Sequence, residues 1–592
     1  MRRTKIICTL GPKTRDEENI KRILQAGADA IRINFSHDNH EIHGETAKRV
    51  IKVREALKKP IPLILDTKGP EIRTGVLKND EDVKLSIGDS FTLTTKEIEG
   101  DKQKVSVTYK GLAEDLEVGS RILIDDGLIE LKVSEIDGND IKCVVLNGGM
   151  LGSRKGINIP DTFVNLPALT EKDILDVQFA AKAGFDYIAA SFIRQASDVI
   201  KIRQVLEDAG GADIQIIAKI ENRDGVNNID EIIEVADAIM VARGDLGVEI
   251  PTEEVPIVQK MLIKKANRAG KPVITATQML DSMIRNPRPT RAETTDVANA
   301  IFDGTSAIML SGETAKGDYP IEAIQTMARI AEAAEAEVLS GEMPLLQPKA
   351  YGISMTNAMS HATCSAAKEL EAACIVSITK SGYTARSISK FKPSCPIVGC
   401  TYNERVQRQL NLVWGCKPLL IESKPGDSTD DVFARAVSKI ESTGLAQQGD
   451  VIVLSAGVPV GREGSSNIMR VQYVGSVLSK GEGYGDKIVT GRACVIKALE
   501  EAKKTFRQGD ILVAHKTTNE LLPYMKKASA IVVEESALDE NNHAVIVGRT
   551  LDIPVIIGAN GILEGLKTAT VITVDSQNGY IYNGVVHGNS EA

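Results

Sequence analysis

Short apolar runs with strand character alternate with amphipathic stretches through the first 340 residues, and this alternation restricts the fold more than any other feature. A strand, a helix and a further strand in that order form a parallel pair with a helical crossover. The runs are Lys5–Leu10, Ala30–Phe35, Pro62–Leu65, Tyr187–Ala190, Ile214–Ala218, Ala238–Val241, Pro272–Ile274 and Ala307–Leu310. Eight such units predict an α/β protein with a closed (β/α)8 TIM barrel, and an open doubly wound sheet is the alternative.

The stretch Thr252–Lys271 carries the end signals of a helix. Thr252 and the two glutamates that follow it suit a cap and a first turn, and Gly270 stands near the end. We therefore expect one helix over this stretch.

The barrel pattern is interrupted between about residues 70 and 168. This part has alternating apolar residues, many Gly and Asp turns and little helical periodicity. We expect an inserted small β-barrel domain, 70–168, between two barrel parts, 1–69 and 169–340. A domain inserted beside a barrel mouth is well placed to act as a lid.

The strand and helix pattern resumes after a proline-marked linker, Glu342–Lys349. Residues 350–474 are expected to form an open α/β domain. Its strands are expected near Ile375–Thr379, Pro396–Cys400, Lys417–Ile421 and Asp450–Ser455. A glycine-rich stretch then leads into an extra segment, 475–592.

Charge and cysteine usage exclude several classes of protein. The net charge of −9 speaks against a broad nucleic-acid footprint. The eight cysteines are scattered without a CxxC pair, which indicates a reducing cytoplasm rather than a zinc ribbon or a thioredoxin-like site. We expect no membrane span, because no apolar run approaches the ~20 residues required.

Six of the eight runs end in tips that carry charged or hydroxyl groups, at residues 34–37, 66–69, 219–222, 243–245, 275–278 and 311–314. In a β/α barrel these ends share one face, where active sites are built. Side chains two apart on a strand point the same way. This spacing predicts that Arg32, Asn34 and Ser36 line one face together, as do Lys219 with Glu221 and Thr275 with Thr277.

Glu221 and Asp245 come from adjacent strands of the expected barrel. Two carboxylates facing a shared space suit Mg²⁺, which keeps waters and takes substrate oxygens, and Mn²⁺ would also fit. The structural alternative is an ion-pair layer among Lys219, Glu221, Arg32 and Asp66. Cations near a metal indicate an anionic, phosphorylated substrate, and phosphoryl transfer asks mainly for positioning and charge neutralisation.

Seven blocks of sequence closely resemble the pyruvate kinase family, in order and at suitable spacing over residues 1 to about 474. Together they are very specific, whereas one alone would be weak. The blocks are Arg32–His37 (RINFSH), Leu65–Gly75 (LDTKGPEIRTG), Ser153–Asn158 (SRKGIN), Ala218–Asn222 (AKIEN), Ala242–Gly247 (ARGDLG), Thr275–Leu280 (TATQML) and Leu310–Ala315 (LSGETA).

The resemblance implies transfer of the phosphoryl group of phosphoenolpyruvate to ADP, giving pyruvate and ATP. It implies that Arg32 holds the substrate phosphate, that Lys219 neutralises the phosphoryl group in flight, and that Thr277 helps to deliver a proton to the enolate carbon. The remaining implied residues are Gly244, Asp245 and Thr277 for substrate, Glu221 and Asp245 for Mg²⁺, Asn34, Ser36, Asp66 and Thr67 for K⁺, and Asn34, His37, Arg73 and Lys155 for the nucleotide. Glu71 stands where K⁺-dependent members carry glutamate, and the family implies a homotetramer.

A loop in the third domain, Thr379–Ala385, follows a strand and opens a helix. Backbone N–H groups and hydroxyls at such a place favour an anion, and an ordinary capping turn is the alternative. In pyruvate kinases a matching loop holds the phosphate of an allosteric effector. The resemblance implies that the phosphate is held here by Thr379, Lys380, Ser381, Gly382 and Thr384, and that Gly457–Asn467 would close over the effector. The sequence does not distinguish fructose bisphosphate, AMP and ribose 5-phosphate.

The segment 475–592 resembles the mobile, swivelling phosphohistidine domain of phosphoenolpyruvate-utilising enzymes, with His543 at the matching place. The surrounding motif fits poorly, because Ser536-Ala537 replace paired glycines and Asn541-Asn542 replace hydroxyl residues. We therefore expect a structural or regulatory domain. The alternatives are a dikinase-like enzyme that routes phosphate through His543 and a non-catalytic metabolite sensor, against which the intact set of Lys219, Glu221, Asp245 and Thr277 argues.

Overall fold

The computed structural model describes residues 2–160, 162, 164–340, 354–422, 424, 427–447, 449–457, 466–475, 477–535 and 542–585. The linker Glu342–Lys349, most of Gly457–Asn467, and Ser536, Ala537 and Asn541 beside His543 lie outside these residues. The chain divides into two compact units. The first comprises Met1–Ala362, Thr379–Leu420 and Gly461–Asn467, and the second comprises Thr363–Ile378, Ile421–Val460 and Ile468–Ala592.

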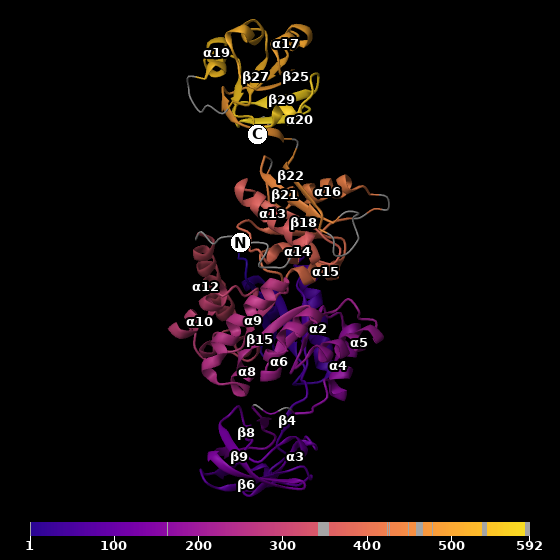
Figure 1. Cartoon of the computed structure of the whole chain (residues 1–592), viewed down its shortest axis with the longest axis vertical. Coiled ribbons are helices and arrows are strands. Elements are labelled where there is room, and N and C mark those ends of the chain that lie inside the picture. Colours follow the sequence, from indigo (N-terminus) through magenta and orange to yellow (C-terminus); the bar gives the residue numbers. More distant parts are fainter. Residues whose placement is uncertain are drawn as a thin grey trace. The chain divides into compact units, whose positions relative to one another are not determined.

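Eight parallel strands of the first unit close into a barrel, in the order β1-β17-β16-β15-β14-β13-β3-β2. Figure 1 labels one of these strands, β15, among the helices of the barrel. The strands are β1 (Lys5–Leu10), β2 (Ala30–Asn34), β3 (Leu63–Asp66), β13 (Tyr187–Ala190), β14 (Gln215–Ile220), β15 (Ala238–Ala242), β16 (Val273–Ala276) and β17 (Ala307–Leu310). The closure comes from β1, which pairs with both β2 and β17. The predicted barrel is thus confirmed, and the open sheet is excluded.

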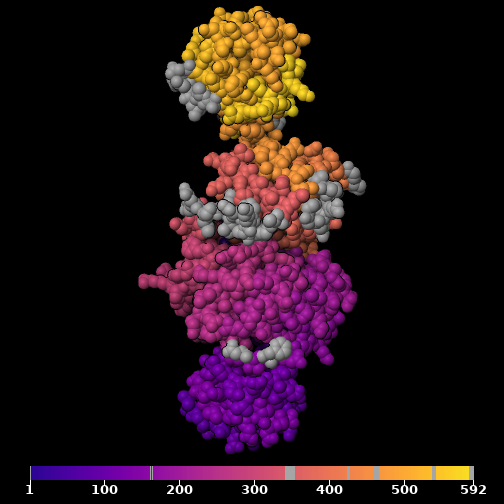
Figure 2. Space-filling model, viewed as in Figure 1, coloured from indigo at the N-terminus to yellow at the C-terminus, as the bar shows by residue number. Residues whose placement is uncertain are grey.

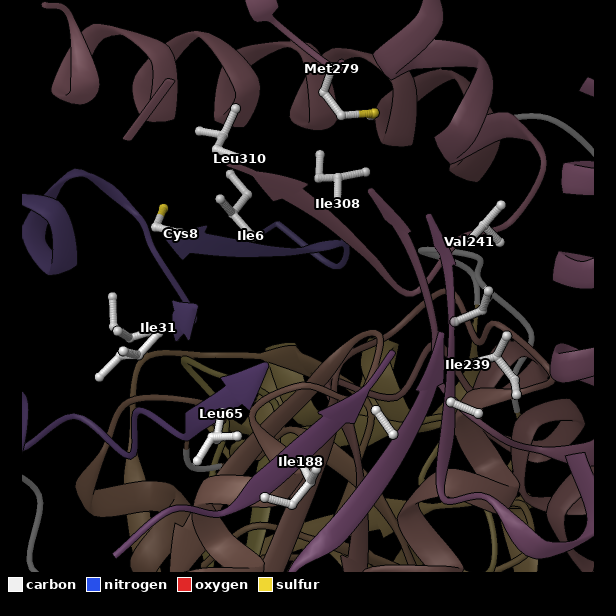
Figure 3. Close-up of a cluster of buried hydrophobic side chains, with 14 of the residues drawn as sticks. Ile6, Cys8, Ile31, Leu65, Ile188, Ile239, Val241, Met279, Ile308 and Leu310 are labelled. Carbon is white, nitrogen blue, oxygen red and sulfur yellow. The ribbon is translucent and has the colours of Figure 1, made fainter. Parts of the chain in front are cut away.

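The strands are buried on both faces, as parallel strands under helices must be. Ile7 of β1 belongs to the cluster inside the barrel, while its neighbours Ile6 and Cys8 belong to the cluster between strands and helices. Figure 3 shows this outer cluster, with Ile6, Cys8 and Ile308 projecting from their strands. The main covering helices are α1 (Glu17–Ala26), α2 (His40–Ala56), α4 (Glu171–Ala183), α5 (Ala196–Asp208), α7 (Ile229–Val235), α9 (Val255–Ala269), α10 (Arg291–Phe302) and α12 (Pro320–Ser340).

The expected helix over Thr252–Lys271 begins later than predicted. A 3-10 turn, η2 (Thr252–Glu254), precedes α9, and the side chain of Thr252 makes no capping hydrogen bond. Pro256 sits in the first turn of α9, where its missing N–H costs nothing. Gly270 ends the helix with a left-handed φ of 70°, as expected.

The interruption between β3 and β13 forms a compact β-rich body (Figure 2). Its seven-stranded sheet consists of β4 (Ile72–Arg73), β12 (Gly156–Asn158), β8 (Arg121–Ile124), β9 (Ile129–Asp137), β10 (Asp140–Asn147), β6 (Ser90–Thr94) and β7 (Lys104–Ser106), in that order. A bridge between Thr74 and Val107 joins the two edges of the sheet. The edges therefore meet as in a small barrel.

The region after the barrel keeps the strand and helix alternation. In the first unit, β19 (Ile397–Thr401) pairs in parallel with β20 (Cys416–Leu420), accompanied by α14 (Tyr383–Ser389) and α15 (Glu404–Leu410). In the second unit, β18 (Cys374–Ile378) pairs in parallel with β21 (Val451–Ala456), and β22 (Ile468–Tyr473) is antiparallel to β21. The expected open α/β character is confirmed.

The last part of the chain forms a mixed eight-stranded sheet in the order β23-β30-β29-β25-β26-β27-β28-β24. Its strands are β23 (Val477–Lys480), β24 (Glu482–Tyr484), β25 (Ile488–Ile496), β26 (Ile511–Ala514), β27 (Ala530–Val533), β28 (Val555–Ile557), β29 (Val571–Asp575) and β30 (Tyr580–Asn583). Its longest helices are α17 (Leu499–Thr505) and α19 (His543–Leu551). Among all described helices, none has both the length and the apolar character needed to cross a bilayer.

Candidate active site

A chain of ion pairs crosses the carboxyl end of the barrel. Arg32 Nε donates to Asp66 Oδ2 at 2.6 Å, and Lys219 Nζ lies 3.0 Å from Asp66 Oδ1 and 2.9 Å from Glu221 Oε1. Arg32 and Lys219 are only 8% exposed. The structure therefore brings together the four residues of the ion-pair alternative, one of which, Glu221, also belongs to the metal-site prediction.

Strand geometry explains most of this arrangement. Lys219 and Glu221 stand two residues apart at the end of β14, so both side chains point the same way. Sequence reasoning missed Ser191, which follows β13 and accepts a hydrogen bond from Lys219 Nζ at 2.7 Å. It also missed the N–H of Phe192, which donates to Glu221 Oε2 at 2.7 Å. The available signal was that Ser191 is the polar tip of the run Tyr187–Ala190.

The charges of these four ion-paired residues influence one another strongly. Burial pushes the pKa of Asp66 upward, but Arg32 and Lys219 outweigh it and hold that pKa below its usual range. Burial disfavours the charged form of Lys219, yet Asp66 and Glu221 raise its pKa above the ordinary value. Lys219 therefore stays cationic at neutral pH.

Glu221 and Asp245 share a region of excess negative charge. Burial raises the pKa of Glu221 to about 7 against the attraction of Lys219, and the charge of Asp245 adds to the rise. Asp245 is exposed in the first turn of α8 (Arg243–Glu249), directly after β15. The charge of Asp245 acts on Glu221, and a pair of carboxylates is a ligand set that Mg²⁺ takes together with waters and substrate oxygens. The described residues contain no cluster of three His, Cys, Asp or Glu that would bind a metal without substrate or water.

Thr275 and Thr277, which the spacing predicts to point the same way, separate in the structure. Thr275 is fully buried and donates to Thr305 Oγ1, which precedes β17, so the expectation that Thr275 faces the mouth is wrong. Thr277 lies past the strand end with φ 68°. Its Oγ1 accepts the N–H of Gly244 at 2.8 Å. Strand alternation does not extend to a residue in left-handed conformation, so the spacing of two residues does not place Thr277 on the same face as Thr275.

The residues implied for K⁺ lie at the ends of β2 and β3. Asn34 and Asp66 are direct partners in the parallel register of these strands. Asn34 Oδ1 accepts the N–H of Ser36 at 3.0 Å, and Thr67 Oγ1 accepts the N–H of Ser191 at 3.1 Å. This part of the mouth presents oxygen ligands, which suit a hard cation.

The residues implied for the nucleotide fall into separate places. Asn34 and the exposed His37 line a cavity of about 330 Å³ that also includes Arg15 and Lys316, two cations that the sequence reasoning missed. Arg73 lines a cavity of about 490 Å³ with Asp126, Asn158 and Asp245. Lys155 lines neither cavity and pairs with Asp125 at 2.9 Å. The structure does not bring the four implied residues together in one cavity.

The loop Thr379–Gly382 connects the end of β18 to the start of α14. Its Gly382 has φ 81° and stands at the cap position of α14, with no side-chain capping bond. Arg386 Nη1 donates to the carbonyl of Ser381 at 3.1 Å, and Ser466 Oγ donates to Thr384 Oγ1 at 2.9 Å. Because Gly382 has no side chain, α14 begins without a side-chain cap at this position.

His543 is the first residue of α19 in the second unit. Its Nδ1 lies 2.9 Å from Thr517 Oγ1 and its Nε2 lies 3.2 Å from Asn519 Oδ1. Asn542 caps the helix through the N–H of Ala544. Because both ring nitrogens are hydrogen-bonded, this geometry favours a structural histidine over a phosphate carrier.

Comparison with known proteins gives a consistent result over nearly the whole chain. Family models match at residues 1–324 (pyruvate kinase, barrel domain), 357–472 (pyruvate kinase, alpha/beta domain) and 506–579 (PEP-utilising enzyme, mobile domain). A pyruvate kinase of Bacillus licheniformis is 48% identical over 99% of both chains. The pyruvate kinase of Geobacillus stearothermophilus is 47% identical over 98% of this chain and 99% of its own length.

Proposed function

The chain belongs to the pyruvate kinase family, and from this we propose how its barrel mouth transfers the phosphoryl group of phosphoenolpyruvate to ADP, giving pyruvate and ATP. The observation that carries the assignment to this mouth is the buried chain Arg32–Asp66–Lys219–Glu221 beside the exposed Asp245. The chain is a phosphotransferase, and we propose which of its residues perform the transfer.

Arg32 and Lys219 would bind the transferred group. Arg32 holds the substrate phosphate, and Lys219 neutralises the phosphoryl oxygens while the bond to the enol oxygen breaks and the bond to ADP forms. Gly244, Asp245 and Thr277 contact the substrate. Thr277 helps to pass a proton through water to the enolate carbon, and its hydroxyl is held in place by the N–H of Gly244.

Glu221 and Asp245 would hold Mg²⁺ or Mn²⁺, which when bound neutralises the phosphoryl oxygens and orients them for transfer.

Asn34, Ser36, Asp66 and Thr67 would hold K⁺. Asn34, His37, Arg73 and Lys155 would supply nucleotide contacts, and Glu71 pairs with one of these residues, Arg73. We predict K⁺ dependence from Glu71, measured as the rate of pyruvate formation in K⁺ and in Na⁺ buffers of equal ionic strength. Full activity in Na⁺ alone would contradict it.

Regulation belongs to the loop before α14. Thr379, Lys380, Ser381, Gly382 and Thr384 would hold the phosphate of an effector, for which fructose bisphosphate, AMP and ribose 5-phosphate are the candidates.

We further propose a cytoplasmic homotetramer and the domain division 1–69, 70–168, 169–340, 350–474 and 475–592. Light scattering of the purified chain tests the tetramer.

A second candidate, dikinase-like transfer through His543, has a weaker basis, because both ring nitrogens of His543 are engaged. Acid-labile phosphohistidine after incubation with phosphoenolpyruvate would support it. A non-catalytic sensor on the same fold predicts no pyruvate at all.

A coupled pyruvate assay with ADP, Mg²⁺ and K⁺ tests the proposed site, applied to the wild type and to Asp245→Asn. Asp245 is exposed, so this change removes one metal ligand without opening the core. We expect the Mg²⁺ concentration for half-maximal rate to rise about tenfold or more, since a charged contact to a ligand contributes about 1.5–3 kcal/mol. Glu253→Gln, at an exposed glutamate of η2, is the matched control. An unchanged Mg²⁺ requirement in Asp245→Asn would overturn the metal assignment.

A further inference from the structure

A cavity of about 260 Å³ in the first unit lies away from the barrel mouth and is lined by four cationic side chains. Arg268 and Lys271 flank the C-terminal end of α9, and Arg386 and Lys390 stand one turn apart at α14. Asp237 is the one carboxylate among the described lining residues. The lining thus carries a surplus of positive charge.

Three of these cations donate hydrogen bonds to uncharged oxygens. Lys271 Nζ donates to the carbonyl of Ala236 at 2.6 Å, and Arg386 Nη1 donates to that of Ser381 at 3.1 Å. Lys390 Nζ donates to the amide oxygen of Asn357. Asp237 is already shared, because its Oδ2 accepts from Arg203 Nη2 at 2.6 Å.

Burial lowers the pKa values of both lysines, and neighbouring cations add to the shift at Lys271. Burial lowers the pKa of Lys390 to about 8. Burial also lowers the pKa of Lys271, against the attraction of Asp237 and with added repulsion from Arg386 and Arg203. An anion placed among the four cations would remove this repulsion and favour the charged forms.

We propose that this cavity is a second anion site, which binds a phosphate group, either as free phosphate or as the phosphate of a small monoester. Arginine and lysine together suit a phosphate, and the hydroxyls of Tyr383 and Ser387 line the same space. None of the proposed effector-loop residues lines it. The site is therefore distinct from the barrel mouth. It adjoins the effector loop, because Tyr383 lies within that loop and Arg386 donates to the carbonyl of Ser381, but it uses none of the five residues proposed for the effector. It goes beyond the proposed function.

Residue-specific labelling of the full chain tests the site without interference from other phosphate sites. Lysines are acetylated at pH 8 with increasing inorganic phosphate, or chloride at equal ionic strength, and modification of Lys271 and Lys390 is read by peptide mass spectrometry. We expect phosphate, not chloride, to protect both lysines. A parallel series with glycerol 3-phosphate separates the two sources: tighter protection identifies a monoester site, and equal protection identifies a site for free phosphate.

Two variants locate the protecting anion. Arg268→Gln should raise the half-protecting phosphate concentration about tenfold, because it removes one charged donor, whereas Lys264→Gln on the same helix should not. Thr384→Ala in the effector loop should leave protection unchanged. Equal protection in Arg268→Gln, protection by chloride, or loss of protection in Thr384→Ala would each overturn the proposal.

Discussion

At the scale of single residues, Lys392 shows how burial controls charge outside the active site. Its Nζ lies 4.4 Å from the centroid of the Trp414 ring, and burial lowers its pKa to about 7, with Glu335 opposing the change. Between this pKa and the ordinary lysine value near 10.4, the unfolded chain binds a proton that the folded chain does not. Folding stability therefore rises with pH in this window. Below pH 7 the folded state bears the full free-energy penalty of keeping buried Lys392 protonated.

Lys392→Met removes this penalty at the cost of a cation–π contact. We expect its stability relative to the wild type to be more favourable at pH 6 than at pH 9, by on the order of 2 kcal/mol. Urea unfolding of both proteins at the two pH values measures the difference. A pH-independent difference between the two proteins would show that Lys392 keeps its ordinary pKa in the folded state.

The sequence could predict side chains that a regular strand orients, and it could not predict those that depend on the neighbouring strand. Lys219 and Glu221 were predicted together from their spacing alone. Ser191 reaches Lys219 only because β13 pairs with β14, and Thr277 depends on a positive φ that no strand pattern indicates.

At the scale of elements, Gly382 sets the turn from β18 into α14. A Cβ at this residue would lie 2.7 Å from Arg386 Nη1 and 3.1 Å from Leu410 Cδ2, and its φ of 81° adds about 1–2 kcal/mol of backbone strain. We expect Gly382→Ala to raise the half-saturating concentration of the effector about tenfold, with the unstimulated kcat within about twofold of wild type. Each of the three candidate effectors is titrated in the pyruvate assay.

Gly444→Ala is the matched control, because Gly444 has φ 67° but open space around the added Cβ. It carries the backbone strain without the crowding at Arg386. An effector response in Gly382→Ala equal to that of the wild type would remove this loop from the effector site.

The start of α19 provides a test of the tail. His543→Ala should leave kcat within about twofold of wild type, because the hydrogen bonds of both ring nitrogens indicate a structural role. His515→Ala, which removes an exposed histidine paired with Glu534, is the control. A large loss of turnover in His543→Ala alone would revive phosphate transfer through this residue.

Element positions were largely predictable, because apolar runs mark buried parallel strands directly. Tyr187–Ala190 and Ala307–Leu310 match β13 and β17 at both ends. The start of α9 was not predictable in this way. Thr252 and its glutamates have the pattern of a helix cap, but Pro256 places the first turn three residues later. The rigid geometry of Pro256, and not the cap pattern at Thr252, therefore decides where the helix begins.

At the scale of the whole molecule, sequence order does not fix which strands become neighbours. Closure of the barrel could be expected from its eight repeats. The bridge between Thr74 and Val107, and the placement of β24 beside β28 in the tail, join segments that lie far apart in the sequence, and no local pattern indicates them. Such pairings depend on tertiary packing, as β-structure in general does.

The central claim is that the ion pairs at the barrel mouth serve phosphoryl transfer and are not only a structural layer. The measurement that tests it most directly is kcat for pyruvate formation by Lys219→Met, with urea unfolding of the same preparation. Methionine removes the charge but nearly keeps the length. Arg32 still pairs with Asp66, and Glu221 can take up a proton, so a folded variant is expected.

We predict that kcat falls about 100-fold or more in folded Lys219→Met, since the charge that stabilises the phosphoryl group in transit is lost. Lys265→Met, which removes a surface lysine paired with Asp230, should keep the wild-type rate. Folded Lys219→Met with wild-type kcat would contradict the account and leave the four residues as a structural layer.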